Sequence, residues 1–397
     1  MISRKRPLFI SGISPGPTGT GRLLEFIEQS SDEQGGKVDF IYGPLGLPSH
    51  KEAFAQGRWG EALRLVWRKV LGKIRMRVLV PLVQILGRDR TLVIFHFQSI
   101  GFARVERLLA NHRGKIYAYL VDNNFFCLRS YNHLPGTNDS CLACLNSDFS
   151  AAKKNNCPSQ PFPEADALGF LERLRALVRE GRIGVLTQNA EHQRLAETHF
   201  GPQADVSLVG DWMSDWETPP PPLSKEGGRS IAYDVVFHGA PEPAKGNLWA
   251  LALARAMPSR RFLFPFSAIS LPQGETLPEN ADFKAMNWNS GLGAHCQSAQ
   301  AVLVPSLSSS PVEGALLKSI RWARLSVVVD VEGAFSQEIS DDLLLRLPKD
   351  PKAAASVFEA RLASGWKPEE KSRRTWFENY RRENIRVLNQ ILGAIEK

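Results

Sequence analysis

The sequence has no run of apolar residues that approaches the ~18 needed to cross a bilayer. A short apolar stretch, residues 7–13, follows three basic residues, as in a secretory signal. Glycines and prolines between positions 12 and 17 break it at once. We therefore interpret it as a buried strand that enters a glycine-containing loop, and we expect a cytoplasmic protein.

Cysteine is also scarce, with five in 397 residues, and in the cytoplasm such thiols are expected to be reduced, metal-bound or buried. Hydrophobic residues make up 43% of the chain and charged residues 23%, which argues against disorder and suffices for two α/β domains. The formal net charge of +8 favours anionic partners.

Strand-like runs alternate with helical patterns in both halves of the chain, which predicts doubly wound, mostly parallel sheets. A Pro/Gly-rich segment, 213–230, has the composition of a linker. We therefore expect domains at 1–212 and 231–370, and an amphipathic helix at 371–397 that crosses back to the first domain. The predicted strands are 7–13, 38–42, 92–97, 115–121, 184–187, 234–239, 261–264, 301–305 and 326–330.

Two stretches of the second half, 235–246 and 302–320, carry the most informative motifs. A strand followed by a glycine and then Lys-Gly, and later a Pro-Ser pair with a Glu-Gly turn before a helix, resembles the retaining GT-B glycosyltransferases of the family-four type. The matching positions are Gly239, Lys245, Gly246, Pro305, Ser306, Glu313, Gly314 and the strand 327–329.

The resemblance implies a GT-B fold, in which two Rossmann-like doubly wound domains face a central cleft. The first domain would bind the acceptor and the second a nucleotide sugar. The implied reaction moves a hexosyl-type group, with retention of configuration, to a saccharide acceptor, either free or lipid-linked, as in capsule or lipopolysaccharide synthesis. It requires no cofactor and involves no nucleic acid.

The donor positions have a physical rationale. A sugar nucleotide leaves as a diphosphate, so fixed cations and backbone N–H groups stabilise the charge that develops. Lys245 lies just past a predicted strand end and before a helix. Glu313 precedes a predicted helix, where its carboxylate could accept hydrogen bonds from hydroxyls of the sugar. The alternative is a solvated lysine and a helix-capping glutamate. The predicted donor-binding residues are Lys245, Gly239, Gly246, Ser310, Glu313, Gly314 and Lys318.

Three positions depart from the family pattern. An arginine of the family is Ala240 here, its second glutamate aligns with Lys318, and its His-Asp pair appears as Val121-Asp122. We expect rearranged donor contacts, with Lys318 supplying the lost positive charge. The alternative is a degenerate site, and with it a non-catalytic sugar-nucleotide-binding or scaffold protein of a glycan assembly complex.

In the first half, Gly16, Gly19 and Gly21 follow the first strand without forming a full dinucleotide fingerprint. They allow close approach to acceptor and diphosphate, or simply a tight turn. Asp122 ends a strand and resembles the acceptor-side aspartate of the family, which could orient or deprotonate a hydroxyl. His96 also ends a strand, and is either a second catalytic candidate or a structural histidine.

Four cysteines lie in a loop-rich insertion, 127–157. Their spacing suits a structural zinc site with four thiolates, in which His133 could replace one ligand. Buried or unpaired thiols, or a facultative disulfide, are the alternatives. The predicted ligands are Cys127, Cys141, Cys144 and Cys157.

The segment 58–90 contains nine Lys/Arg and only Glu61 and Asp89 as acids. Apolar residues, among them Trp59 and Trp67, recur at helical spacing, which is typical of a helix on an anionic membrane surface. We therefore expect peripheral binding to the inner face of the cytoplasmic membrane. The alternatives are a helix packed on its own sheet and, with less support, binding of RNA.

Overall fold

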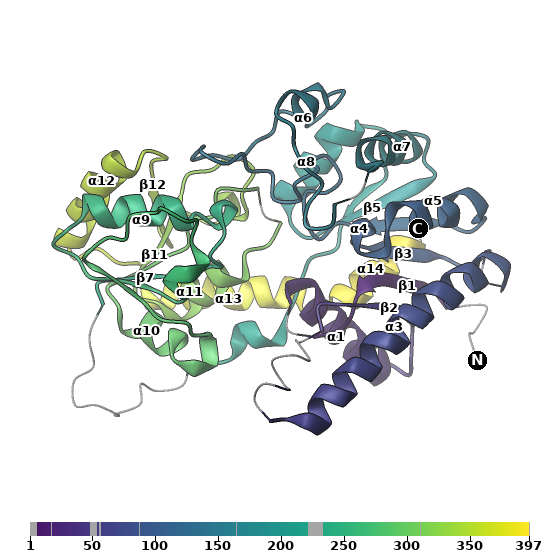
Figure 1. The fold of residues 1–397 in the computed structure, drawn as a ribbon, viewed down its shortest axis with the longest axis horizontal. Helices are drawn as coiled ribbons and strands as arrows, with labels where there is room; N and C mark the ends of the chain where they lie inside the picture. The colour runs from purple at the N-terminus through teal and green to yellow at the C-terminus, as the bar shows by residue number, and fades with distance from the viewer. Residues whose placement is uncertain are drawn as a thin grey trace. The chain divides into compact units, whose positions relative to one another are not determined.

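The computed structural model describes residues 6–16, 18–47, 54, 57–86, 88–163, 165–220, 233–309 and 311–396. The chain forms two compact units (Figure 1). The first unit comprises Met1–Ser130, Ala143–Met213 and Glu383–Lys397, and the second comprises Tyr131–Leu142 and Ser214–Arg382.

The first unit is built on a parallel six-stranded sheet in the order β2-β1-β3-β4-β5-β6. Strands β3, β4 and β5 are buried at every residue, as expected for parallel strands covered on both faces. The strands are β1 (Leu8–Ile13), β2 (Asp39–Leu45), β3 (Leu92–Phe95), β4 (Ile116–Tyr119), β5 (Ile183–Thr187) and β6 (Val206–Leu208).

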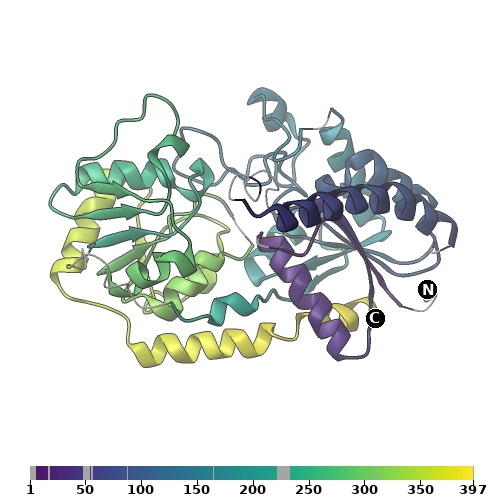
Figure 2. The same cartoon turned by 60° about the horizontal axis from the view of Figure 1, so that its bottom comes forward.

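Helices connect these strands. The longest, α3 (Trp59–Leu86), packs against β2, and α14 (Val387–Glu396) packs against α1 (Gly19–Glu33) (Figure 2). The hydroxyl of Thr18 accepts a hydrogen bond from the Gly21 N–H and so caps α1. The other helices are α4 (Phe97–Ile100), α5 (Phe102–Asn111), α6 (Ser150–Lys154), α7 (Ala167–Arg179) and α8 (Ala190–Phe200).

The second unit has its own parallel six-stranded sheet, in the order β12-β11-β10-β7-β8-β9. Its strands are β7 (Val235–Phe237), β8 (Phe262–Phe264), β9 (Ala281–Phe283), β10 (Ala301–Leu303), β11 (Ser326–Val329) and β12 (Leu345–Leu347). Its helices are η1 (Ser214–Glu217), η2 (Pro243–Lys245), α9 (Asn247–Ala256), η3 (Ala268–Ser270), η4 (Trp288–Ser290), α10 (Leu292–Ser298), α11 (Gly314–Trp322), η5 (Phe335–Glu338), α12 (Pro351–Ala363) and α13 (Glu370–Asn384).

The core of the second unit lies between this sheet and helices α9 and α12. Phe237, Trp249, Phe264 and Phe358 are almost fully buried there, together with the aliphatic side chains of β10 and β11. The indole N–H of Trp249 donates to the backbone oxygen of Lys349, so this buried polar group is satisfied. This packed core holds the strands in place, and the candidate site lies at their carboxyl ends.

The predicted α/β fold with parallel sheets is confirmed, and each predicted strand is present within a few residues. Three further strands, β6, β9 and β12, were not predicted. Residues 131–142, which lie within the expected first domain, belong to the second unit, and residues 383–397 belong to the first. Of the expected linker, 214–217 forms η1, and 221–230 lies outside the described residues.

None of the helices in the described part of the chain is both long enough and apolar enough to cross a membrane.

A close backbone approach between β1 and β2 provides a test of the first unit. A Cβ atom added to Gly43 would lie 2.3 Å from the backbone oxygen of Gly12. We expect Gly43→Ala to lower the free energy of unfolding by roughly 1–3 kcal/mol, measured by urea denaturation, because the strands must move apart. Gly393→Ala is the matched control: its Cβ would meet no atom within 4 Å, and alanine favours the helix. Equal stability of the two variants would contradict the observed packing.

Candidate functional site

A lysine and a glutamate from the two motifs meet in the second unit. Lys245 ends η2, which follows β7, and Glu313 precedes α11, which follows β10. Since β7 and β10 are neighbouring parallel strands, their carboxyl ends lie at one edge of the sheet. Lys245 Nζ lies 2.6 Å from Glu313 Oε2, and the hydroxyl of Ser306 donates to the same oxygen at 2.7 Å.

Both partners are charged at neutral pH. Burial raises the pKa of Glu313, but Lys245 and the Ser306 hydroxyl outweigh it and bring the pKa below its usual value. Burial lowers the pKa of Lys245, but the charge of Glu313 outweighs it and brings the pKa above its usual value. Each side chain is only 14% exposed, so the pair is held away from bulk water. The result is a fixed cation beside a fixed hydrogen-bond acceptor.

Glu313 does not act as a helix cap through its side chain. It occupies the N-cap position of α11 with an extended backbone, yet its carboxylate makes no capping hydrogen bond. Its backbone oxygen accepts from the N–H groups of Leu316 and Leu317. The carboxylate is therefore used for the contacts with Lys245 and Ser306, beside the positive end of the α11 dipole.

The glycines of the two motifs are required by packing. Gly246 has a φ of 74°, and a Cβ atom there would lie 2.0 Å from the backbone oxygen of Pro305. A Cβ atom on Gly314 would lie 2.8 Å from the indole nitrogen of Trp216, and one on Gly239 would lie 2.9 Å from the Phe237 ring. Gly246 thus brings the loop that carries Lys245 against the chain after β10.

Lys318 has an acidic partner that sequence analysis did not find. Its Nζ lies 2.7 Å from Asp215 Oδ2, and 5.2 Å from the centre of the Trp288 ring. The side chain is 9% exposed. Asp215 therefore offsets the charge of Lys318 within the second unit.

His238 was likewise not predicted, although it directly follows β7. Its ring stacks on Trp288 at 5.4 Å, and its Nδ1 lies 3.1 Å from the Ser319 hydroxyl. Burial, with the charge of Lys318, lowers its pKa to about 4. His238 is therefore neutral at pH 7. Its ring contacts Trp288, the same indole that Lys318 contacts.

The segment Tyr131–Leu142 contributes to the second unit despite its place in the first half of the chain. The Asn132 side chain accepts from the Ser309 N–H at 2.9 Å and donates to the Ser309 hydroxyl at 3.1 Å. The Tyr131 ring lies 5.0 Å from Lys245 Nζ, in cation–π contact. Only the fold reveals this neighbour of Lys245. Ser310, another predicted donor residue, lies outside the described residues.

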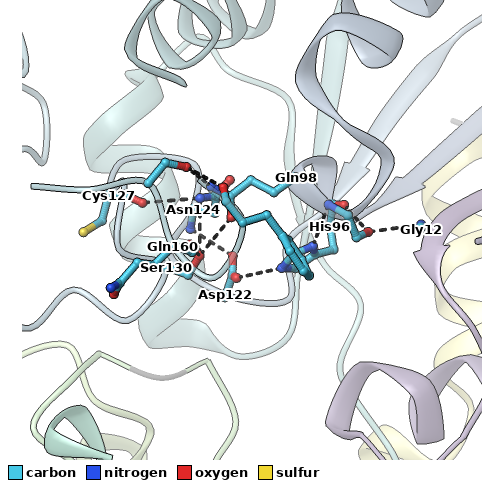
Figure 3. A network of polar contacts seen from close by, with 11 residues as sticks. Gly12, His96, Gln98, Asp122, Asn124, Cys127, Ser130 and Gln160 are labelled. Carbon is cyan, nitrogen blue, oxygen red and sulfur yellow. Dashed lines mark hydrogen bonds and ion pairs between the residues drawn. The ribbon is translucent and has the colours of Figure 1, made fainter. Parts of the chain in front are cut away.

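In the first unit, Asp122 and His96 meet at the carboxyl ends of β4 and β3 (Figure 3). Asp122 Oδ2 lies 3.3 Å from His96 Nε2, and its other oxygen accepts from the Asn124 N–H at 2.9 Å. His96 Nδ1 accepts from the Ser99 N–H at 3.2 Å, which leaves the proton on Nε2 to donate to Asp122. His96 adopts a left-handed conformation with a φ of 56°, unusual for a non-glycine residue.

These contacts favour an orienting role for Asp122. Burial raises its pKa, but the hydrogen bond from His96, with the hydrogen bonds of Asn124 and Ser130, brings the pKa below its usual value. A carboxylate stabilised in its charged form is a weak base at neutral pH. Asp122 is therefore suited to accept a hydrogen bond from a hydroxyl rather than to remove its proton.

The glycines after β1 form a compact turn. Gly16 N–H donates to the Gly21 oxygen at 3.3 Å, and a Cβ atom on Gly21 would meet the Thr18 hydroxyl at 2.8 Å. Gly19 is the first residue of α1. The tight-turn interpretation accounts for Gly16 and Gly21 without a ligand.

The structure does not assemble the predicted zinc site. Within the described ranges, which include all four cysteines and His133, no three His, Cys, Asp or Glu side chains are placed to hold a metal ion. Cys127 and Cys144 are buried and Cys157 is partly exposed in the first unit, whereas Cys141 belongs to the second.

Solved structures with similar folds match almost the whole chain. Sucrose-phosphate synthase from Thermosynechococcus elongatus aligns over 99% of this chain and 98% of its own, at a TM-score of 0.59 and 12% identity. Anabaena HepE in complex with UDP-glucose aligns over 98% of both chains, at a TM-score of 0.57 and 11% identity. A UDP-forming trehalose-phosphate synthase from Burkholderia xenovorans aligns over 99% of both chains, at a TM-score of 0.54 and 10% identity. The chain has the GT-B fold.

Comparison of sequences does not assign the chain to a family within the GT-B fold. No family model matches this chain, and no curated protein does. The fold places Lys245 and Glu313 in the C-terminal unit and Asp122 and His96 in the N-terminal unit, each pair at the carboxyl ends of a parallel sheet. Ligands of open α/β sheets bind at these ends.

The Lys245–Glu313 pair makes a specific prediction for stability. Lys245→Met leaves a buried carboxylate without its cation, which we expect to lower the free energy of unfolding by roughly 3 kcal/mol. The double variant Lys245→Met, Glu313→Gln is expected to lose less, because no buried charge remains. Urea denaturation of the parent, single and double variants measures both differences.

The exposed pair Lys349–Asp139 of the same unit provides the control. Lys349→Met is expected to cost less than about 1 kcal/mol. A single variant Lys245→Met as stable as the double variant would show that Glu313 does not depend on Lys245.

Proposed function

We propose that this protein is a glycosyltransferase that moves a sugar from a nucleotide-sugar donor to a saccharide acceptor. The observation that carries the proposal is the buried pair Lys245–Glu313 at the strand ends of the second unit, beside the N-terminus of α11. The fold supports it, since structures with this fold were solved with UDP and with UDP-glucose.

In this proposal the donor binds the second unit. Lys245 Nζ meets the diphosphate and stabilises the negative charge that develops as the sugar leaves. Glu313 accepts hydrogen bonds from sugar hydroxyls, and the first N–H groups of α11 face phosphate oxygens. Tyr131, over Lys245, shields that cation from water and so strengthens its interaction with phosphate.

The acceptor, in the same proposal, binds the first unit. Asp122, held by His96 and Asn124, orients the attacking hydroxyl, and the configuration of the transferred hexosyl group is retained. We further propose that the acceptor belongs to a surface glycan such as capsule or lipopolysaccharide, and that it is linked to a lipid. The protein would then act in the cytoplasm, peripherally at the inner face of the cytoplasmic membrane.

One observation favours a second function. Asp215 offsets the charge of Lys318, and Ala240 offers no cation where the family has an arginine. Lys245 would then be left with little further positive charge beside it to stabilise the diphosphate. The second candidate is therefore a non-catalytic sugar-nucleotide-binding or scaffold protein of a glycan assembly complex. It predicts binding of the nucleotide sugar without release of the nucleoside diphosphate.

A panel of UDP-, GDP- and TDP-sugars tests the proposal by thermal shift. A donor at about 100 times its Kd adds roughly 2.7 kcal/mol to stability, which shifts the melting temperature by several degrees. We expect Tyr131→Ala to weaken binding about 2- to 30-fold through loss of the cation–π contact, whereas Tyr131→Phe keeps the ring and the affinity.

Ile269→Ala, at a 94% exposed position of the same unit, is the matched control and should bind like the parent. Release of the nucleoside diphosphate with a saccharide acceptor then separates transfer from binding alone. A parent protein that no nucleotide sugar stabilises would contradict both candidate functions.

A further inference from the structure

Helix α3 has two apolar faces, and the fold uses only one of them. Ala62, Leu65, Met76 and Val83 are buried. Gly72, also buried, allows close contact with Pro44 of β2, at 3.0 Å from an added Cβ atom. α3 packs through this face against β2 and α5. The sequence alone assigned the helix a single apolar face.

The second apolar face of α3 is exposed. Its largest side chains, Trp59, Leu63 and Trp67, are 63–65% exposed. Further exposed apolar side chains continue the stripe at helical spacing, so seven large hydrophobic residues share one side of the helix. Isolated exposed apolar residues are ordinary, but a continuous stripe of this kind marks an interaction surface. The stripe consists of Trp59, Leu63, Trp67, Val70, Leu71, Ile74 and Val78.

Basic side chains border the stripe on both sides. By helical geometry Arg64 and Arg68 lie along one border, and Lys73 and Arg77 along the other, and all four are exposed. The only acid in α3 is Glu61, which forms an ion pair with Arg58. The positive charge beside the stripe is therefore not offset by acids of the same helix.

We infer that the outer face of α3 is a membrane-docking surface that lies flat in the interface of a bilayer with anionic headgroups. Apolar side chains enter the acyl boundary, tryptophans favour the interface, and Lys/Arg at the borders reach the headgroups. A nucleic acid would use the charge but leave the stripe in water. A second copy of this chain would cover the stripe but bring like charges together.

The inference deepens the proposed function, on which it rests for a membrane-linked acceptor, but the surface itself is argued from α3 alone. The experiment uses the full chain and vesicles of phosphatidylcholine, with and without an equal share of phosphatidylglycerol. One variant carries Arg64→Glu, Arg68→Glu and Lys73→Glu. A second carries Trp67→Ser and Ile74→Ser. A control reverses three exposed charges of the same unit, Lys153→Glu, Lys154→Glu and Arg182→Glu.

The parent and the control are expected to co-sediment with the anionic vesicles, and less so as salt increases. Charge reversal in α3 should weaken this binding at least about a hundredfold, since each of the three basic residues near such a surface contributes about fivefold. The Trp67→Ser, Ile74→Ser variant should also lose binding. Both α3 variants should keep the melting temperature of the parent and its shift with a nucleotide sugar.

Three results would overturn the inference: a parent that binds no vesicles, a charge-reversal variant that binds as the parent does, or a control that loses binding equally. A dimer that Trp67→Ser, Ile74→Ser dissociates, without vesicle binding by the parent, would assign the stripe to a second copy. Vesicle binding by a parent that no nucleotide sugar stabilises would instead refute the proposed function and leave the surface in place.

Discussion

The buried ion pair between Lys245 and Glu313 is the constraint on which the second unit depends. Removing two charges from water is costly, so the pair persists only because each partner is held in place. Gly246 lets the Lys245 loop approach the chain after β10, and Ser306 holds the carboxylate. The close approach at Gly246 thus keeps the Lys245 ammonium group at the carboxyl edge of the sheet.

The first unit also holds a charged side chain away from water, in the pair His96–Asp122. Asp122 is held by His96 and by backbone and side-chain donors of the chain that follows it, so its negative charge needs no lysine or arginine. A carboxylate in such a setting is fixed in direction and weak as a base. The first unit therefore holds a fixed anion, and the second holds a fixed cation. In the proposed function the anion orients a hydroxyl and the cation stabilises a leaving phosphate.

Much of the fold could be predicted because buried parallel strands read as continuous apolar runs. The three missed strands, β6, β9 and β12, have three residues each and form sheet edges, where burial is incomplete and the pattern weak. Lys245 and Glu313 could be predicted as one site, since both follow strands. Tyr131 and Asp215 could not, because their contacts join segments about a hundred residues apart.

Hydrogen exchange of the intact chain, with and without saturating UDP, tests the central claim most directly: that the Lys245–Glu313 pair marks the donor site. A bound diphosphate would order the backbone N–H groups around it and slow their exchange. We expect this protection in the segments 239–247 and 306–317. Binding of UDP with protection confined to the first unit, or absent from both segments, would contradict the account.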